Sequence, residues 1–149
     1  MNRKPHEIQG FSLAECLVVL ACMAILASMT LPNIHTLQQE WVLWGGTVAV
    51  ESSLQWGRMH AVTANSALIF KVSGNGKRYC WVEAESGEEF SNTVQIMPNG
   101  LRIASQPGKP LRFYQHGNAV PAGSYVIAGE AGSYSVVVSP GGRIRTERN

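Results

Sequence analysis

A long apolar run near the N-terminus is the strongest pattern in the chain. Residues 1–10 are mostly polar and include basic side chains, and an apolar stretch follows from Phe11 to Leu31. At 1.5 Å per residue, a helix of this length spans about 31 Å, which is enough to cross the hydrocarbon core of a bilayer. The pattern predicts a transmembrane helix over residues 11–31, with the basic leader held on the cytoplasmic side.

Beyond Pro32 the apolar positions become periodic. They recur at spacings of three and four residues, which is typical of an amphipathic helix. These positions are Ile34, Leu37, Trp41, Trp44, Val48, Met59 and Val62. We expect a stem helix over residues 32–65, with Trp41, Trp44 and Trp56 in packing contacts. Two alternatives stay open: Pro32 ends the first helix, or Gly45-Gly46 breaks the second, because proline and glycine both disfavour helix interiors.

Short strands separated by turn residues occupy the rest of the chain. Residues 67–72 and 77–82 flank Ser73-Gly74-Asn75-Gly76, a pattern typical of a β-hairpin. Glycine, proline and asparagine separate the further expected strands, at 93–97, 101–104, 111–115, 125–128, 133–139 and 143–146. The expected fold class is therefore α+β: a long N-terminal helix, transmembrane and then amphipathic, packs on an antiparallel β-sheet or β-sandwich domain over residues 66–149.

One acidic residue, Glu15, interrupts the apolar run. An ionised side chain at the centre of a membrane helix costs roughly 2.5–3.5 kcal/mol on insertion scales. A chain that keeps Glu15 there needs a partner charge for it. A free amine made by cleavage after Gly10 is the natural candidate, and the retained apolar stretch then follows the cut, unlike that of a secretory signal.

This junction resembles the type III signal of type IV pilins and type II secretion pseudopilins. The matching residues are Gly10 before the cut, Phe11 as the new N-terminus and Glu15 as the fifth mature residue. The resemblance implies that a prepilin peptidase removes residues 1–10 and methylates Phe11. It also implies that Glu15 pairs with the N-terminus of a neighbouring pilin in a filament. The mature chain would be a single-pass protein of the bacterial inner membrane, with a periplasmic C-terminal domain, that enters a pilus or pseudopilus or lies at its tip.

The C-terminal domain resembles the GspH/FimT family of minor pilins and pseudopilins. The resemblance is carried by Leu111–Asn118, by the strand Tyr134–Val138 and by Gly142-Arg143-Ile144-Arg145. Members similar to FimT carry a Gly-Arg-x-Arg and bind double-stranded DNA during natural transformation. The resemblance implies that Gly142, Arg143 and Arg145 form such a site, and Arg148 adds a further charge. Secretion pseudopilins and pilus-priming subunits share the fold, so a purely structural role in secretion or filament assembly is the alternative function.

The chemistry of the arginine tail is compatible with either function. If residues 143–146 are extended, Arg143 and Arg145 point to one side and Ile144 to the other, with the two arginine Cβ atoms about 6.5–7 Å apart. A guanidinium can donate two hydrogen bonds to one phosphate. The competing interpretation is that both arginines are the solvated face of the last strand, with Ile144 in the core. Lys77, Arg78, Lys109 and Arg112 could extend a basic patch.

Charge and residue composition exclude several classes of function. The formal net charge is only +2, so a nucleic-acid site has to be a local patch. Cys80 is the only cysteine beyond the apolar run, so no disulfide is expected in the C-terminal domain. His35, His60 and His116 are scattered, without the spacing of a metal site. We therefore expect a protein that is not an enzyme and has no metal or other cofactor.

Overall fold

The computed structural model describes residues 12–149, and for residues 29–33 it describes the backbone alone. The leader, Gly10 and Phe11 lie outside the described residues, so the predicted cleavage site does too. The chain divides into two units, one up to Leu37 and one from Gln38 to Asn149.

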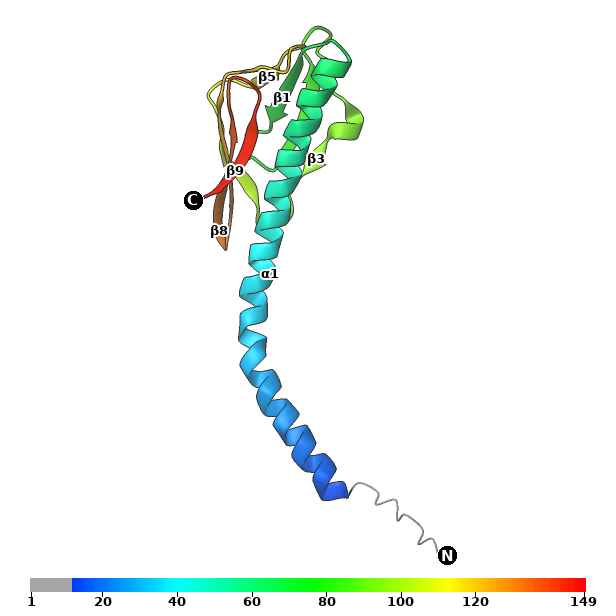
Figure 1. The fold of residues 1–149 in the computed structure, drawn as a ribbon, viewed down its shortest axis with the longest axis vertical. Coiled ribbons are helices and arrows are strands. Elements are labelled where there is room, and N and C mark those ends of the chain that lie inside the picture. The colour runs from blue at the N-terminus through cyan, green and yellow to red at the C-terminus, as the bar shows by residue number, and fades with distance from the viewer. Residues whose placement is uncertain (1–11) are drawn as a thin grey trace, which may run out of the picture. The chain divides into compact units, whose positions relative to one another are not determined.

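A single helix, α1 (Leu13–Thr63), covers most of the predicted apolar run and most of the predicted stem (Figure 1). Its backbone is helical at position 32 and through Gly45-Gly46, so neither site breaks the helix. At its start the Glu15 N–H donates to Ser12 Oγ at 3.2 Å, and the Ser12 N–H donates to the Glu15 carboxylate at 3.4 Å. This reciprocal arrangement is a capping box, which satisfies two of the free N–H groups at a helix N-terminus.

Side chains of the first unit are exposed wherever the structure describes them. They include Leu17, Leu20 and Ile25, each more than half exposed. Among the described residues, no helix combines the length and the hydropathy needed to cross a membrane. The predicted span over residues 11–31 includes residues outside the described ones.

The strands of the second unit form two antiparallel sheets within the described residues. The first sheet has the order β3 (Gln95–Ile96), β2 (Arg78–Glu83), β1 (Leu68–Val72), β5 (Leu111–Phe113) and β6 (Ala119–Val120). The second has the order β4 (Arg102–Ser105), β7 (Gly123–Gly129), β8 (Gly132–Val138) and β9 (Ile144–Arg148). A short 3-10 helix, η1 (Ser91–Thr93), precedes β3. The expected α+β fold, a long helix packed on antiparallel strands, is confirmed (Figure 1).

The hairpin between β1 and β2 follows the sequence pattern closely. The two strands pair from Leu68 with Glu83 to Val72 with Tyr79. In the turn, Gly76 has a φ of 69°, which is a left-handed conformation that glycine adopts without a steric penalty. The Asn75 side-chain oxygen accepts from the Ser73 hydroxyl at 2.6 Å, which fastens the turn.

The core of the second unit lies between α1 and the inner faces of both sheets. From α1 it takes Leu43, Val50, Leu54 and Ala61, all buried. The sheets contribute aromatic residues, and Trp81, Phe70 and Tyr125 are at most 1% exposed. The Phe70 ring packs against Trp81 and Tyr125 with centroids 5.0 and 5.3 Å apart. Burying aromatic side chains of this size supplies much of the stabilisation of a small domain.

The predicted apolar stripe of the stem is not the face that packs on the strands. Trp41 is 71% exposed, and Met59 and Val62 are also exposed. The buried face includes Gly46 and Gly57 instead, where an added Cβ would overlap Leu101 and the ring of Trp81. The helix packs on the strands through Leu43, Val50 and Leu54 together with these glycines, and none of these residues belongs to the predicted stripe. Of the tryptophans, Trp44 packs on Tyr134 and Trp56 packs on Trp81, as expected.

Candidate nucleic-acid interface

The Gly-Arg-x-Arg segment forms the turn between β8 and β9 and the start of β9. Ser139 closes this turn: its N–H donates to the Arg143 carbonyl at 2.9 Å, and its Oγ accepts from the Arg143 N–H at 3.0 Å. Beyond the turn, Ile144 pairs with Val138 and Arg148 with Tyr134. Strand β9 is an edge strand of its sheet, so one side of its backbone is not paired with a neighbouring strand of that sheet.

Side chains alternate along β9 as an extended strand requires. Arg143, Arg145 and Glu147 are exposed, whereas Ile144 and Thr146 are half-buried. Ile144 packs against the core, and the Thr146 hydroxyl donates to the Glu51 carboxylate of α1 at 2.8 Å. The predicted alternation is present, with the two arginines on the outward face.

The three tail arginines differ in their surroundings. Arg145 pairs with Glu147 at 3.0 Å, and Arg148 pairs with Glu40 of α1 at 3.4 Å. The Arg148 guanidinium also lies 5.9 Å from the centre of the Tyr134 ring. Both ion pairs are more than 40% exposed, so they stabilise the fold little. Within residues 12–149, no acidic side chain pairs with Arg143.

Gly142 has a structural role in this turn. It is buried, and its φ is 75°, a left-handed conformation. A Cβ at this position would overlap the Gly117 carbonyl oxygen and come within 2.8 Å of Arg58 Nε. The glycine therefore lets the turn between β8 and β9 lie directly against the turn between β5 and β6.

A helix residue that the sequence analysis did not identify, Arg58, fastens the two turns to α1. Its Nε donates to the Gly117 carbonyl at 3.1 Å, and one terminal nitrogen reaches the Gly141 carbonyl at 3.5 Å. Its partners are backbone carbonyls 59 and 83 residues away in sequence, which carry no side-chain signature. The one feature of the sequence that could have indicated a packed position for Arg58 is the neighbouring small residue Gly57, near the end of the helix.

A groove of about 630 Å³ runs between the end of α1 and these two turns. Its lining combines cationic, polar and apolar side chains. They include Gln55, Arg58, Met59, Val62, His116 and Arg143. No aspartate or glutamate lines it, so the charged side chains of its lining, Arg58 and Arg143, are both cationic.

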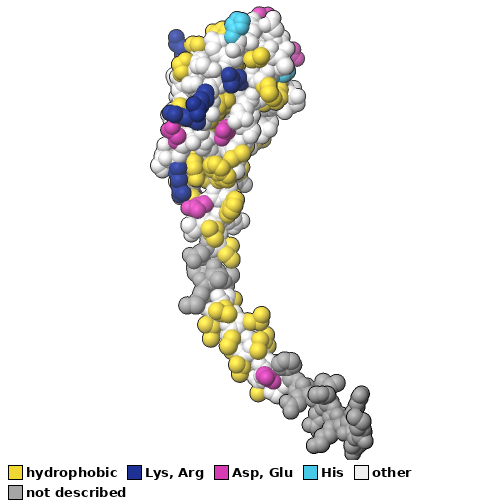
Figure 2. Space-filling model, viewed as in Figure 1, with side chains coloured by type: hydrophobic (Ala, Val, Ile, Leu, Met, Phe, Trp, Pro, Cys, Tyr) yellow, Lys and Arg dark blue, Asp and Glu magenta, His cyan; other side chains and the backbone are white. Residues whose placement is uncertain are grey.

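The other basic residues considered lie elsewhere. Arg78 pairs with Glu89 at 3.3 Å on the hairpin of the first sheet, and Arg112 lies over the Tyr114 ring at 5.9 Å. Neither these two nor Lys77 and Lys109 line the groove. Figure 2 shows lysine and arginine side chains on the face of the second unit in view, interspersed with acidic and apolar ones.

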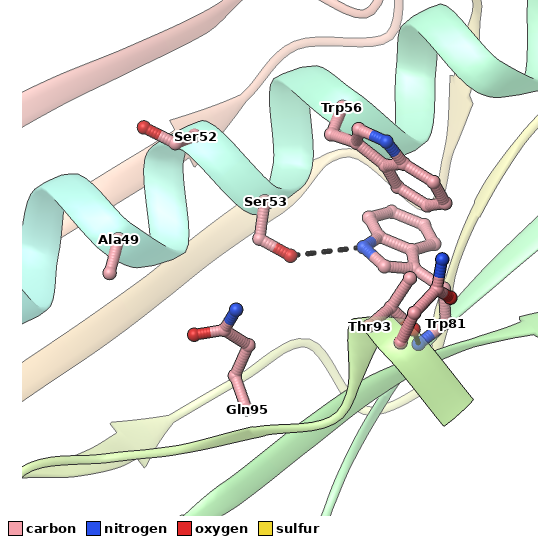
Figure 3. A pocket seen from close by; sticks show the side chains of 8 residues that line it. Ala49, Ser52, Ser53, Trp56, Trp81, Thr93 and Gln95 are labelled. Carbon is pink, nitrogen blue, oxygen red and sulfur yellow. Dashed lines mark hydrogen bonds between the residues drawn. The ribbon is translucent and has the colours of Figure 1, made fainter. Parts of the chain in front are cut away.

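A second cavity, of about 410 Å³, lies beside α1 (Figure 3). Its floor is the Trp81 indole, whose Nε1 donates to Ser53 Oγ at 3.0 Å, and Trp56 packs beside it. Thr93 and Gln95 also line it, with Thr93 next to Trp81 (Figure 3). No titratable side chain lines this cavity, so it offers no group for acid–base chemistry.

Reactive groups are few in the part of the chain that the structure describes. Cys80 is buried, and burial raises the pKa of its thiol, which disfavours the reactive thiolate. Burial likewise raises the pKa of Tyr79 to about 12. Among the described residues, no three histidine, cysteine or acidic side chains are placed to hold a metal ion.

Comparison with known proteins supplies the family. The family model of the type II transport protein GspH matches residues 47–142, and the model of the prokaryotic N-terminal methylation motif matches residues 7–31. The GspH match ends at Gly142, so Arg143, Arg145 and Arg148 lie beyond it. No curated protein matches the sequence.

Solved structures share the fold at low sequence identity. The type IV minor pilin FimU of Pseudomonas aeruginosa is 20% identical, with a TM-score of 0.60 over 70% of this chain and 87% of that one. The minor pseudopilin EpsH of the Vibrio cholerae type 2 secretion system is 12% identical, with a TM-score of 0.59 over 71% of this chain and 96% of that one. The resemblance to minor pilins and pseudopilins is confirmed, and the chain belongs to the family of the type II transport protein GspH.

Proposed function

We propose that this chain is a type IV filament subunit that binds duplex DNA through Arg143 and Arg145 and serves DNA uptake in natural transformation. The observation that carries the proposal is the turn from Ser139 to Arg143. It places both guanidinium groups on the outward face of an edge strand, while Ile144 packs inward. Guanidinium groups that lie side by side suit the phosphates of a DNA backbone.

Contacts between guanidinium groups and phosphates involve the DNA backbone and not the bases. Phosphate contacts position a protein on DNA without conveying sequence information, so we expect little sequence preference. With two to three phosphate contacts, log K should fall with log salt at a slope of roughly −2 to −3. Binding by one subunit is then weak, and several subunits on one filament would strengthen it.

A gel-shift titration at two salt concentrations tests this function. The soluble fragment that begins near residue 38 should shift duplex DNA of any sequence, and more strongly at the lower salt concentration. Arg143→Ala with Arg145→Ala should abolish the shift and leave the melting temperature unchanged, because both side chains are exposed. Unchanged binding by the double variant would exclude the tail as the site.

The proposal also includes processing and assembly. A prepilin peptidase would cut between Gly10 and Phe11 and methylate Phe11, and the apolar segment that follows would anchor the chain in the inner membrane. The match to the methylation motif supports this route. In the filament, Glu15 would pair with the amine of a neighbouring pilin, and the exposed apolar side chains of α1 would contact other subunits.

The capping box suggests a sharp test of charge pairing by Glu15. Glutamine can replace glutamate in a capping box, whereas valine cannot. If the charge drives assembly, Glu15→Gln and Glu15→Val should both insert into the membrane and both join filaments poorly. Normal assembly of Glu15→Gln beside defective Glu15→Val would show that the cap, and not the charge, is needed.

A structural role without DNA binding is the second candidate. Two observations favour it: Arg145 and Arg148 are already paired with glutamates, and the GspH match ends before the tail. In that case the chain would serve protein secretion or filament initiation through the exposed faces of α1. Absence of any gel shift at low salt, with normal filament assembly, would favour this second function.

A further inference from the structure

The groove beside α1 carries an inference that rests on the proposed function and extends it. Two arginines line the groove, Arg58 on the helix and Arg143 on the turn between β8 and β9. We propose that this groove binds one phosphodiester of the DNA backbone, so that Arg58 and Arg143, and not Arg143 and Arg145 alone, form the centre of the site.

Arg58 is held in place before any ligand arrives. Its bonds to the carbonyls of Gly117 and Gly141 use Nε and one terminal nitrogen, which leaves N–H donors for a further acceptor. A side chain that is already ordered loses less rotamer entropy on binding, so its contacts contribute more to affinity. The same two bonds fix the position of Arg143, because Gly141 and Arg143 belong to one turn.

The charge of the groove selects an anion. Arg143 has no acidic partner within the described residues, whereas Arg145 and Arg148 would have to leave theirs. The nearest acid along the helix, Glu51, does not line the groove and accepts from both Thr146 and Gln55. His116 lines the groove as well and contributes the polar nitrogen atoms of its imidazole ring.

The apolar part of the lining favours a nucleotide unit over a free anion. Met59 is 68% exposed and Val62 is 49% exposed, and Ile144 lies beside them in the groove. A phosphodiester carries a sugar on each side, whose carbon atoms can cover these side chains while the phosphate oxygens accept from the guanidinium groups. An acidic peptide would satisfy the charge as well, so its binding has to be tested separately.

Replacing Arg58 would remove bonds that hold two turns to α1, so a loss of binding could reflect a damaged fold. A negative charge added to the groove tests the proposal without removing Arg58. Gln55→Glu adds a carboxylate to the lining at an exposed helix position. Because it also removes the amide that donates to Glu51, its melting temperature is compared with that of the unaltered chain. The matched control is Gln38→Glu, also exposed on α1 and about 26 Å further along the helix axis. With the full chain in detergent micelles, fluorescence anisotropy with a labelled duplex should show about fivefold weaker binding for Gln55→Glu at low salt. Gln38→Glu should bind like the unaltered chain, and equal binding by both variants would overturn the inference.

A second measurement separates this inference from the proposed function. Inorganic pyrophosphate should shift the Arg58 Nε–H resonance in a ¹⁵N-labelled full chain, and Gln55→Glu should suppress that shift. If pyrophosphate shifts the resonance but duplex DNA does not bind, the proposed DNA function fails and the groove stands as a phosphate site. If DNA binds but neither ligand moves the resonance, the groove fails and the tail site stands. Binding of poly-glutamate as tightly as duplex DNA would overturn the assignment to a phosphodiester.

Discussion

Gly142 lies so close to the carbonyl of Gly117 that a β-carbon at position 142 would overlap its oxygen atom. The contact joins the turn that carries the arginines to a turn of the other sheet. A hydrogen bond between the same two turns supports this contact, from the Ala119 N–H to the Pro140 carbonyl at 2.9 Å. The glycine of the Gly-Arg-x-Arg motif thus positions the arginines and does not itself need to touch a ligand.

Replacement of Gly142 by alanine should therefore destabilise the protein. Both the left-handed backbone and the overlap with Gly117 oppose a side chain, and strain of this kind costs on the order of 1–3 kcal/mol. The neighbour Gly141 is the matched control, because a Cβ there meets nothing within 4 Å. In thermal unfolding, Gly142→Ala should lower the melting temperature by several degrees and Gly141→Ala should leave it nearly unchanged. Equal melting temperatures would show that the two turns can separate at little cost.

Two of the glycines in α1, Gly45 and Gly57, should respond in opposite ways to replacement by alanine. A helix interior favours alanine over glycine by about 0.5–1 kcal/mol. At Gly45 a Cβ meets nothing within 4 Å, so Gly45→Ala should raise the free energy of unfolding by about that amount. At Gly57 a Cβ would overlap the ring of Trp81, which is fully buried, so Gly57→Ala should lower it.

Denaturant titration of Gly45→Ala and Gly57→Ala measures the change in the free energy of unfolding for each variant. The sign of the change is the readout, since both substitutions are the same in chemistry and both lie within one helix. A stabilised Gly57→Ala would mean that α1 can move away from Trp81 without loss of packing.

The sequence predicted the parts of the fold that depend on local patterns. Three features were predicted from the order of residues close together in the chain. They are the end of the helix, the hairpin around Gly76, and the alternation of Arg143, Ile144 and Arg145. The apolar periodicity of the stem does not identify the buried face of the helix, because large apolar side chains occur on more than one of its sides. The packed side combines Leu43, Val50 and Leu54 with the small residues Gly46 and Gly57, which a scale of hydrophobicity does not single out.

The candidate site was predicted only in part for a related reason. Arg143 and Arg145 are visible in the sequence as a motif, but their ion pairs and the groove depend on tertiary contacts. Glu40 and Arg148 are 108 residues apart, and Arg58 binds carbonyl groups that any residue type could supply. The short strand β6 was also missed, because two residues are too few for an alternating pattern.

Glu147 should weaken DNA binding through its ion pair with Arg145. The carboxylate holds Arg145 Nε at 3.0 Å and repels a phosphate that approaches the same face. Glu147→Gln should therefore strengthen duplex binding by a few-fold at low salt and steepen the salt dependence by about one phosphate contact, a slope change of roughly −0.9. The control is Glu85→Gln, which removes the same charge at an exposed position that does not line the groove. Equal gains in both variants would indicate a general charge effect and no particular role for Arg145.

Acid should weaken the fold through Glu83. The hydroxyl of Ser86 donates to its carboxylate at 2.7 Å, and that of Ser66 donates at 3.0 Å. These bonds lower the pKa of Glu83 below its ordinary value of 4.5, with the bond from Ser86 the larger cause. A carboxyl group whose pKa is lower in the folded state stabilises the fold above its ordinary pKa, and this contribution is lost as the pH falls through the folded value.

The double variant Ser66→Ala, Ser86→Ala tests this pH dependence. It should melt at a lower temperature than the unaltered chain at pH 7, and the difference should shrink as the pH falls below about 4.5. Ser124→Ala serves as the control, because Ser124 is exposed on β7, away from Glu83. Its effect on the melting temperature should be small and the same at every pH. If the double variant lost equal stability at pH 7 and pH 3, the two serines would act through packing, and the charge of Glu83 would not be their target.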